Sequence, residues 1–370
     1  MKPILKNPIF EKRTKGDASL VGLEIEAGSI GATEVRANGS VTVTAAAVEP
    51  LPPGAFRDGE VADPGAITEA LRSLFSTHKL GRRVRLGIAN QRVVVRTLRL
   101  PAIDDPKELD SAVRFTAQEQ IAMPLDQAVI EHRVVGGVAA ADDAPPQVDV
   151  MVVAARRDMI AASLKPLRDA GLEPVGVDLA AFGMIRALAD LGVPATDATE
   201  AVVQPTQAAV LYCNVGDVTN LAVAKGRSCL FTRVSPVGLG DIAGSLAAGT
   251  GLSPEHAQMW LDHVGLARPV KQVEGDANVI ASTRSALEPG AASLLDELRL
   301  SLDFYGAQEG AVPVERILLC GPGSAIDGLA EHMESVLALP IAVGRPEALG
   351  GLDAGAAARL TLPYGLALDL

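Results

Sequence analysis

Aromatic residues and cysteines are scarce in this sequence. Phe, Trp and Tyr make up 3% of its 370 residues, with a single Trp. The three cysteines, Cys213, Cys229 and Cys320, are an odd number, lie far apart and each falls inside a predicted strand. A disulfide framework is therefore excluded, and we expect reduced thiols in the core of a cytosolic protein.

A net positive charge and long apolar runs are absent as well. Lys and Arg total 33 against 45 Asp and Glu, a formal net charge of -12 at pH 7, which excludes a broad nucleic-acid-binding surface. No apolar run approaches the roughly 18 to 20 residues that a bilayer-spanning helix needs. Residues 1–17 are basic, lack the apolar centre of a signal peptide, and are predicted to form a flexible arm. We expect a cytoplasmic protein without a membrane span.

Two segments of the chain resemble each other, which predicts an internal duplication. The first is VGLEIEAGSIGATEV (residues 21–35) and the second lies within AAVLYCNVGDVTNLAVAKGRSCLFTRVS (208–235); each has the pattern of a β-hairpin. Glu24-Ile25-Glu26 aligns with Asn214-Val215-Gly216 at a constant offset, and a hydroxyl residue, Ser29 or Thr219, follows each. With 48% apolar residues, the chain is long enough to build two similar lobes.

The region between these hairpins predicts further strands and helices. Apolar residues at helical spacing behind a proline predict a helix over 64–79, and two strands follow at 84–89 and 92–98. Residues 99–178 have the pattern of a separate small strand–helix unit, and the Pro-, Thr- and Ala-rich stretch 192–207 marks a crossing between lobes. Near the end, the apolar strand RILLC runs into GPGSAIDGLAEHMESVLA, a strand, glycine turn and helix.

Several stretches together resemble one protein family. They are RTLRLPAI, AVRFTAQEQIAMPLDQAVIEHRVV and VMVVAARRDMIAASLKPLRDAGLEPVGVDLAAFGMIRAL in the small unit, then LFTRVSPVGLGDIAGSLA, EHAQMWLDHVG and ILLCGPGSAIDGL. On these residues the sequence resembles the PilM family, actin-like cytoplasmic proteins of type IV pilus assembly and relatives of the cell-division protein FtsA. The resemblance covers roughly residues 20–370, and the small unit is its most specific part.

The resemblance implies a bilobed actin-like ATPase fold of the α/β class with an inserted small α/β subdomain. Its expected parts are the arm (1–17), part of the first lobe (18–98), the insert (99–178), a helix and lobe crossing (179–207), the second lobe (208–350) and a segment returning to the first lobe (351–370).

In such a fold, the resemblance implies, two hairpin turns grip the phosphates of ATP with Mg²⁺ and a later glycine turn holds the nucleoside. Carried over to this sequence, the nucleotide-binding positions are Glu24, Gly28, Ser29, Asn214, Gly216, Asp217, Thr219, Gly321, Gly323 and Ser324. Glu24 or Asp217 would bind the Mg²⁺ ion. Glycines and other small residues let main-chain N–H groups approach phosphate closely.

The first and second turns depart from the family pattern. The first turn of the family has Asp, then Gly two residues later and Lys at the end, where this chain has Glu24, Glu26 and Gly31. A Glu26 carboxylate about 4 Å from a phosphate would cost about 4 kcal/mol at an effective dielectric near 20. In the second turn Asn214 replaces Asp, and Asp217 either substitutes for it or forms the turn. Both changes predict weakened nucleotide binding.

In the third turn, Pro322 removes one main-chain donor. Gly321 and Gly323 beside it still allow a nucleoside to approach, or they serve as a plain turn between strand and helix.

The leading functional hypothesis is a scaffold whose insert docks the cytoplasmic tail of a PilN-like inner-membrane protein, as a short peptide in a groove. The chain would then be peripheral at the inner membrane through its partner, with pilus motor or platform proteins as further partners. One alternative is an active ATPase in which Glu24 and Asp217 hold the metal. Another is an FtsA-like filament former, although the sequence ends in PYGLALDL instead of an amphipathic helix. No catalytic residue is assigned, since no nucleophile motif is present and the histidines lack metal-ligand spacing.

Overall fold

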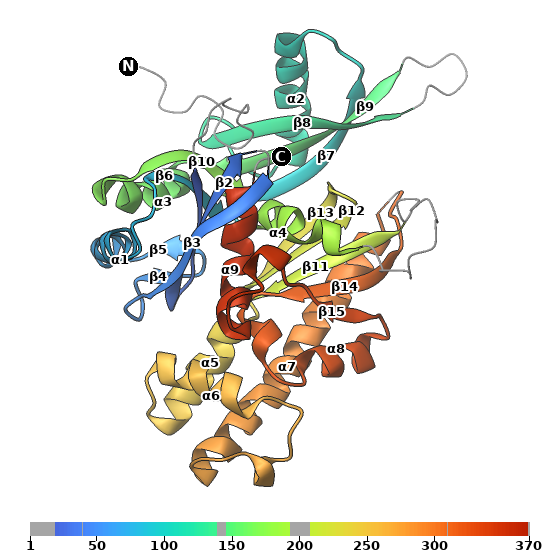
Figure 1. Ribbon diagram of the computed structural model, residues 1–370. Helices are drawn as coiled ribbons and strands as arrows, with labels where there is room; N and C mark the ends of the chain where they lie inside the picture. Colours follow the sequence, from blue (N-terminus) through green and yellow to red (C-terminus); the bar gives the residue numbers. More distant parts are fainter. Residues whose placement is uncertain (1–18, 39, 139–145, 193–207, 309, 369–370) are drawn as a thin grey trace.

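A computed structural model of the chain describes residues 19–38, 40–138, 146–192, 208–308 and 310–368 (Figure 1). The predicted basic arm, and all but the first residue of the predicted crossing stretch 192–207, lie outside these residues. Within the described part of the chain, no helix combines the length and the apolar composition needed to cross a bilayer.

The first lobe is built on a five-stranded mixed sheet. Its strands are β1 (Leu20–Ile25), β2 (Ser29–Asn38), β3 (Ser40–Pro50), β6 (Arg83–Ile88) and β10 (Glu173–Leu179), in the order β10-β6-β1-β2-β3. The hairpin strands β1, β2 and β3 pair antiparallel, whereas β6 and β10 join in parallel. A short hairpin of β4 (Phe56–Arg57) and β5 (Glu60–Val61) stands beside this sheet.

Two helices complete the core of the first lobe. They are α1 (Pro64–Thr77) and α3 (Arg157–Asp169), which pack against each other. The Asp63 carboxylate caps α1 by accepting the N–H groups of Gly65 and Ala66 at 2.9 and 3.0 Å, with Pro64 at the first helical position. The apolar face that the sequence predicts for α1 therefore closes the core over the sheet.

The second lobe repeats the plan of the first. Its strands are β11 (Ala209–Val215), β12 (Thr219–Lys225), β13 (Ser228–Ser235), β14 (Val314–Cys320) and β15 (Ile341–Val343), in the order β13-β12-β11-β14-β15. Counted along each lobe, both sheets have the order third, second, first, fourth, fifth. The predicted duplication is confirmed.

Helices cover the second sheet, and short 3-10 turns connect several elements. The helices are α5 (Leu239–Thr250), α6 (Pro254–Val264), α7 (Ala277–Gly306) and α8 (Leu329–Leu337). In the described part of the chain, the 3-10 turns are η1 (Ala189–Gly192), η2 (Val270–Gln272), η3 (Pro322–Ala325) and η4 (Glu347–Leu349). Cys213, Cys229 and Cys320 lie buried in strands of this lobe and form no disulfide, as predicted.

The insert is a separate three-stranded sheet with one helix. Its strands β7 (Val94–Pro101), β8 (Ala128–Val138) and β9 (Gln147–Arg156) have the order β7-β9-β8, and α2 (Pro106–Gln120) covers one face. In Figure 1 it lies at the opposite end of the molecule from α5 and α6. Val150 and Val152 of β9 pack toward α2, while Met151 and Val153 belong to the core shared with the lobes. Because alternate side chains of a strand point to opposite faces, β9 is buried on both.

The boundaries predicted for the insert were wrong. It spans about 94–156 instead of 99–178, because β10 pairs with β6 in the first-lobe sheet and α3 packs on α1. The sequence marks 173–179 as a buried strand but carries no local signal of which sheet it joins.

Two helices cross between the lobes. They are α4 (Ala180–Leu188), which packs on β11 and β12, and α9 (Ala354–Ala367), which packs on β1 and β2. The C-terminal helix α9 thus packs on the first-lobe sheet. The two helices meet at Gly183 and Gly365, where a Cβ added to Gly365 would lie 1.8 Å from the carbonyl oxygen of Gly183. This contact fixes the crossing of the two helices between the lobes.

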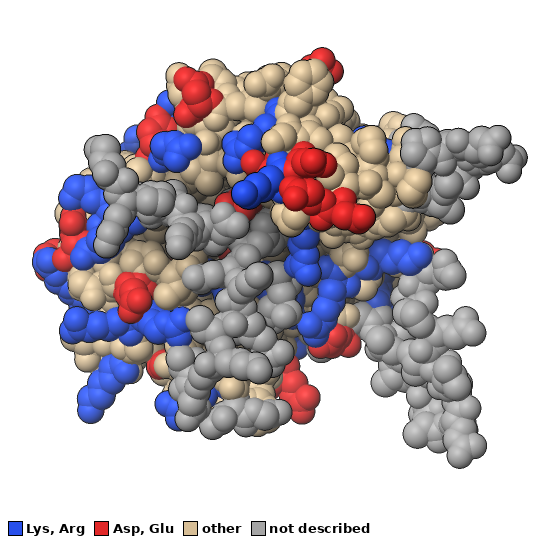
Figure 2. Space-filling model, turned by 90° about the horizontal axis from the view of Figure 1, so that it is seen from above, with Lys and Arg blue, Asp and Glu red and all other residues tan. Residues whose placement is uncertain are grey.

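The surface charge is mixed. On the face seen in Figure 2, Lys and Arg side chains lie interspersed with Asp and Glu. That face therefore lacks the one-sided positive field of a nucleic-acid-binding surface.

Candidate functional site: the cleft between the lobes

The two hairpin turns singled out in the sequence face each other across the cleft between the lobes. The β1–β2 turn carries Glu26 and Ala27, and the β11–β12 turn carries Gly216 and Asp217. The N–H of Ala27 donates a hydrogen bond to the Asp217 carboxylate, and an interaction with the main-chain N–H of Asp217 stabilises the Glu26 carboxylate. The duplication thus brings two equivalent turns into direct contact.

Three carboxyl groups share this cleft, and burial is the main cause of their altered acidity. Withdrawal from water raises the pKa of Glu26 from 4.5 to about 8, with the negative charge of Asp217 as the second cause. Burial, followed by the charges of Glu26 and Asp217, raises the pKa of Glu24 well above its usual value. Burial also raises the pKa of Asp217, against the opposing effect of the Ala27 N–H. The Glu26 carboxyl group therefore holds its proton at neutral pH.

Arg359 of α9 is the cation that faces this cluster. Its charge lowers the pKa of Glu24, Glu26 and Asp217 against the stronger effect of burial. It also lies 3.8 Å from Asp262 of α6. The sequence offered no signal for Arg359, because α9 reaches the cleft from the far end of the chain.

The third turn is a packing element. Gly321 has φ +76°, and the 3-10 turn η3 begins directly after it. A Cβ on Gly321 would lie 1.7 Å from Asn214 Oδ1, and one on Gly323 2.6 Å from Val215 Cγ1. The N–H and the hydroxyl of Ser324 both donate hydrogen bonds to the carbonyl of Gly321, at 3.0 and 2.8 Å. Both glycines are therefore needed for packing against the end of β11, and the Ser324 hydroxyl is already used.

The remaining predicted nucleotide-binding residues differ in whether they are free to contact a ligand. Gly28 is exposed, and a Cβ there would meet nothing within 4 Å. Ser29 begins β2 and its carbonyl accepts the N–H of Glu26 at 2.9 Å. Thr219 is 1% exposed and its hydroxyl donates to the Val237 carbonyl at 2.7 Å. Gly28 is thus the open position, and Thr219 serves the fold.

The alignment of the two turns also needs a correction. Ile25 pairs with Ile30 across the first hairpin, whereas Val215 pairs with Thr219 across the second. The first turn is therefore one residue longer, and Ser29 is not the structural equivalent of Thr219. Sequence alignment at a constant offset cannot detect a difference in loop length that is absorbed within the hairpin.

The position of the family's lysine lies away from the cleft. Gly31 in β2 faces α9, and a Cβ there would lie 3.1 Å from Pro363 Cγ and 3.3 Å from the Arg359 carbonyl oxygen. Glycine is thus required for the close packing of β2 on α9, and a lysine would not fit without moving that helix.

The cavity at the predicted phosphate position is small. The cavity that Glu24, Glu26, Asn214 and Asp217 line has a volume of about 50 Å³, whereas small-molecule sites typically measure about 300 to 1,000 Å³. Carboxylates stand where phosphate oxygens would accept N–H groups. Among the described residues, no group of three or more His, Cys, Asp or Glu side chains could hold a metal ion. Asn214 Oδ1, buried at the same place, has no hydrogen-bond partner among them either.

A second hollow, which the sequence did not reveal, lies beside the insert. Its volume is about 220 Å³. Edge strands of two different sheets border it, β7 of the insert and β13 of the second lobe. We call it the edge-strand groove; its lining residues include Val93 to Arg96, Thr232 to Val234 and Asn220. No local sequence pattern predicts it, because the two edges are brought together only by the tertiary fold.

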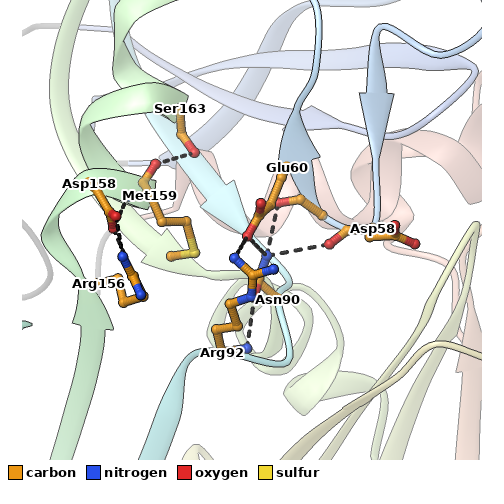
Figure 3. A network of polar contacts seen from close by, with 9 residues as sticks. Asp58, Glu60, Asn90, Arg92, Arg156, Asp158, Met159 and Ser163 are labelled. Carbon is orange, nitrogen blue, oxygen red and sulfur yellow. Dashed lines mark hydrogen bonds and ion pairs between the residues drawn. The ribbon is translucent and has the colours of Figure 1, made fainter. Parts of the chain in front are cut away.

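A polar network braces the entry of the chain into the insert (Figure 3). Asn90 is 4% exposed; its Nδ2 donates to the carbonyl of Gly59 at 3.2 Å and its Oδ1 accepts the N–H of Arg92 at 2.8 Å. Arg92 forms an ion pair with Glu60 at 2.7 Å. The start of β7, and with it one wall of the edge-strand groove, is thereby fixed to the β4–β5 hairpin.

The chain leaves the insert at a second polar contact. Arg156, at the end of β9, pairs with Asp158 in the first turn of α3, and Arg157 Nη2 donates to the Ala128 carbonyl at 2.8 Å. Both ends of the insert are therefore held by side-chain contacts.

Comparison with known proteins assigns this architecture. The family model described as type IV pilus assembly protein PilM matches residues 22–350. A chain of a solved "PilM-PilN type IV pilus biogenesis complex" is 25% identical, with a TM-score of 0.77 over 95% of this chain and 98% of that chain. The ethanolamine utilization protein EutJ from Carboxydothermus hydrogenoformans is 14% identical, with a TM-score of 0.52 over 97% of this chain and 92% of that chain. The predicted bilobed actin-like fold with an insert is confirmed.

Proposed function

Because the chain belongs to the family of type IV pilus assembly proteins PilM, we propose that it is a cytoplasmic scaffold that binds the cytoplasmic segment of a PilN-like inner-membrane protein. The observation that carries this proposal is the match along nearly the whole of both chains to a protein solved as a PilM–PilN complex. The scaffold would be held at the inner membrane through this partner.

The edge-strand groove is the docking place that we propose for this segment. A strand at the edge of a sheet presents unpaired main-chain N–H and C=O groups, to which an extended peptide can add as a further strand. Edge strands border the groove on two sides, and its charged lining residues are Arg96 and Arg233. An extended segment with carbonyl groups or acidic side chains toward these arginines suits such a groove.

The proposed docking place involves the insert and the second lobe together. Arg96 of β7 lines the groove; it is exposed, and its Nη1 donates to the carbonyl of Val95 at 2.9 Å. Arg233 of β13 pairs with Glu297 at 3.1 Å. The insert thus supplies one wall and the second lobe the other.

We propose further that nucleotide is dispensable for this role. The support is the misfit of the cleft: the carboxyl groups of Glu24, Glu26 and Asp217, together with that of Asp58, line a cavity of about 50 Å³ at the expected phosphate position. Mg²⁺-ATP added to the native protein should therefore give no heat of binding in calorimetry up to about millimolar concentration, near -4 kcal/mol of binding free energy. Saturable micromolar binding would reject this part of the proposal and revive the ATPase alternative.

Docking is tested with a fluorescent peptide of the PilN-like cytoplasmic segment from the same organism, by anisotropy on the full-length chain. We expect saturable binding, weakened about tenfold, or about 1.4 kcal/mol, by Arg96→Glu. The control is Arg133→Glu, an exposed arginine on β8, the opposite edge strand of the same small sheet, which should bind as the native protein does. Absence of binding to the native protein contradicts the function; equal loss in both variants contradicts only the place.

A further inference from the structure

The contact between the β1–β2 turn and the β11–β12 turn is reciprocal. The Asp217 carboxylate of the second lobe accepts the Ala27 N–H of the first, and the Glu26 carboxylate of the first lobe interacts with the Asp217 N–H of the second. Main-chain N–H groups of such turns are the donors that an anion would use. Each turn therefore gives its donor to a carboxylate of the other lobe.

Glycine at position 216 is what admits the Glu26 side chain. Glu26 Oε1 lies 2.0 Å from where a Cβ on Gly216 would stand, a distance that no real Cβ could tolerate. The carboxylate thus rests directly on the main chain of the opposite turn. By contrast, Gly28 in the first turn has open space around its missing Cβ.

The charged groups around this contact come from four places. Glu24 lies near the end of β1 in the first lobe, Asp58 of the β4–β5 hairpin lines the same cavity, and Arg359 of α9 faces the carboxyl groups. Asp262 of α6 lies behind Arg359, at 3.8 Å. Arg359 partly neutralises the cluster, which lets two carboxyl groups from opposite lobes stay together.

We propose that Glu26 and Asp217 form a latch that closes the two lobes on each other in place of a nucleotide. The two carboxyl groups act as built-in substitutes for phosphate: they fill the cleft, and their oxygens lie against the main chain of the opposite turn, where a phosphate would bind. This inference rests on the weakened nucleotide site proposed above. It predicts that lobe closure in this protein is set by its own side chains.

The latch also connects the cleft with the edge-strand groove. One wall of the groove is β7, attached to the first lobe, and the other is β13 of the second lobe. Asn220 of β12 lines both the cleft cavity and the groove. Release of the latch therefore separates the two walls and weakens docking of the extended segment.

The test compares two glycine variants. Gly216→Ala places a methyl group on Glu26 Oε1 and expels that carboxylate, whereas Gly28→Ala in the facing turn meets nothing. Spin labels at Ser76→Cys on α1 and Glu255→Cys on α6, both exposed, report the distance between the lobes by pulsed electron resonance, since the native cysteines are buried.

For the native protein and Gly28→Ala we expect one narrow distance, unchanged by Mg²⁺-ATP. Gly216→Ala should give a longer and broader distribution, and hydrogen exchange at the Ala27 amide should become about tenfold faster, as expected for the loss of a charge-assisted hydrogen bond. In a Glu26→Ala background, Gly216→Ala should have no further effect, because its steric partner is gone.

The outcomes separate the latch from the proposed function. Native-like distance and exchange in Gly216→Ala overturn the latch, even where calorimetry shows no nucleotide binding. A native distance that shortens with Mg²⁺-ATP overturns both the latch and the weakened site. If Gly216→Ala fails to fold, Glu26→Gln and Asp217→Asn, which keep side-chain volume, replace it, and unchanged exchange at Ala27 in both overturns the proposal.

Discussion

Arg186 of α4 and Asp178 of β10 form an ion pair with 2.5 Å between Nη2 and Oδ2, where the side chains are 4% and 6% exposed. Arg186 Nε also donates to the Gly365 carbonyl of α9 at 2.8 Å. One guanidinium group thereby joins the first-lobe sheet to both helices that cross between the lobes. Because both side chains are buried, loss of one partner would leave the other charge without water as an alternative partner, at a large cost in stability.

Arg186→Met should lower the free energy of unfolding by about 3 kcal/mol, because Asp178 is left as an unpaired buried charge. The double variant with Asp178→Asn should recover part of this loss. Urea denaturation measures both. Lys165→Ala, which removes an exposed pair with Asp169 on α3, is the control and should cost less than about 0.5 kcal/mol. Equal effects of Arg186→Met and Lys165→Ala would contradict the assigned role.

Gly365→Ala should destabilise the protein by about 1 to 3 kcal/mol, because its Cβ would overlap the Gly183 carbonyl and push α9 from α4. Gly244→Ala within α5 meets nothing within 4 Å and should stabilise by about 0.5 to 1 kcal/mol. Thermal unfolding followed by circular dichroism compares the two. If Gly365→Ala leaves the thermal stability unchanged, the two helices are not tightly packed where they cross.

Stability should fall as pH rises. The pKa of Glu26 is about 8 in the folded chain, raised from 4.5 chiefly by burial, so the folded state binds a proton that the unfolded state has released. Between about pH 5 and pH 8 the free energy of unfolding therefore decreases with pH. The raised pKa values of Glu24 and Asp217 act in the same direction.

Urea midpoints at about pH 6 and about pH 8.5 measure this slope. Glu26→Gln should flatten it, whereas Glu69→Gln on the exposed face of α1 should leave it as in the native protein. An unchanged slope in Glu26→Gln would show that Glu26 is ionised in the folded state across this pH range.

Asn220→Leu should raise stability while weakening peptide docking. Asn220 is 2% exposed, and its Nδ2 has no partner among the described residues; an apolar side chain of similar size avoids the cost of an unpaired buried donor. Asn220 lines the proposed groove, and we expect a carbonyl of the docked segment to accept this donor. Thermal unfolding and peptide anisotropy on one variant test both halves, and loss of stability together with native docking would refute them.

The elements of each lobe were predictable because their signals are local. The hairpins at β1–β2 and β11–β12 follow from alternating apolar residues and small turn residues, and α1 from a proline start with helical spacing. The duplication was visible for the same reason. The partner of a strand is a different matter: β10 was assigned to the insert, since nothing within residues 173–179 distinguishes β6 from β9 as its neighbour.

The candidate site was predictable in part. Glu24, Glu26, Asn214 and Asp217 were recognised as departures from a phosphate-binding pattern, and the fold brings all four to one cleft. Their mutual contact was not foreseen, and neither was Arg359. A side chain's burial and partners depend on segments far away in the sequence, and those set the pKa values of this cluster.

By itself, then, the sequence determined the two hairpin-led lobes, the insert between them and the exchange of phosphate-gripping residues for carboxylates. These features follow from residue type, spacing and turn chemistry along a short stretch of chain. Only the tertiary structure decided that Glu26 and Asp217 meet across the cleft, that α9 carries Arg359 to them, and that residues of the edge strands β7 and β13 line a common groove. Each of these depends on packing between segments that local periodicity cannot relate, because the free energy of those contacts exists only once the lobes are assembled.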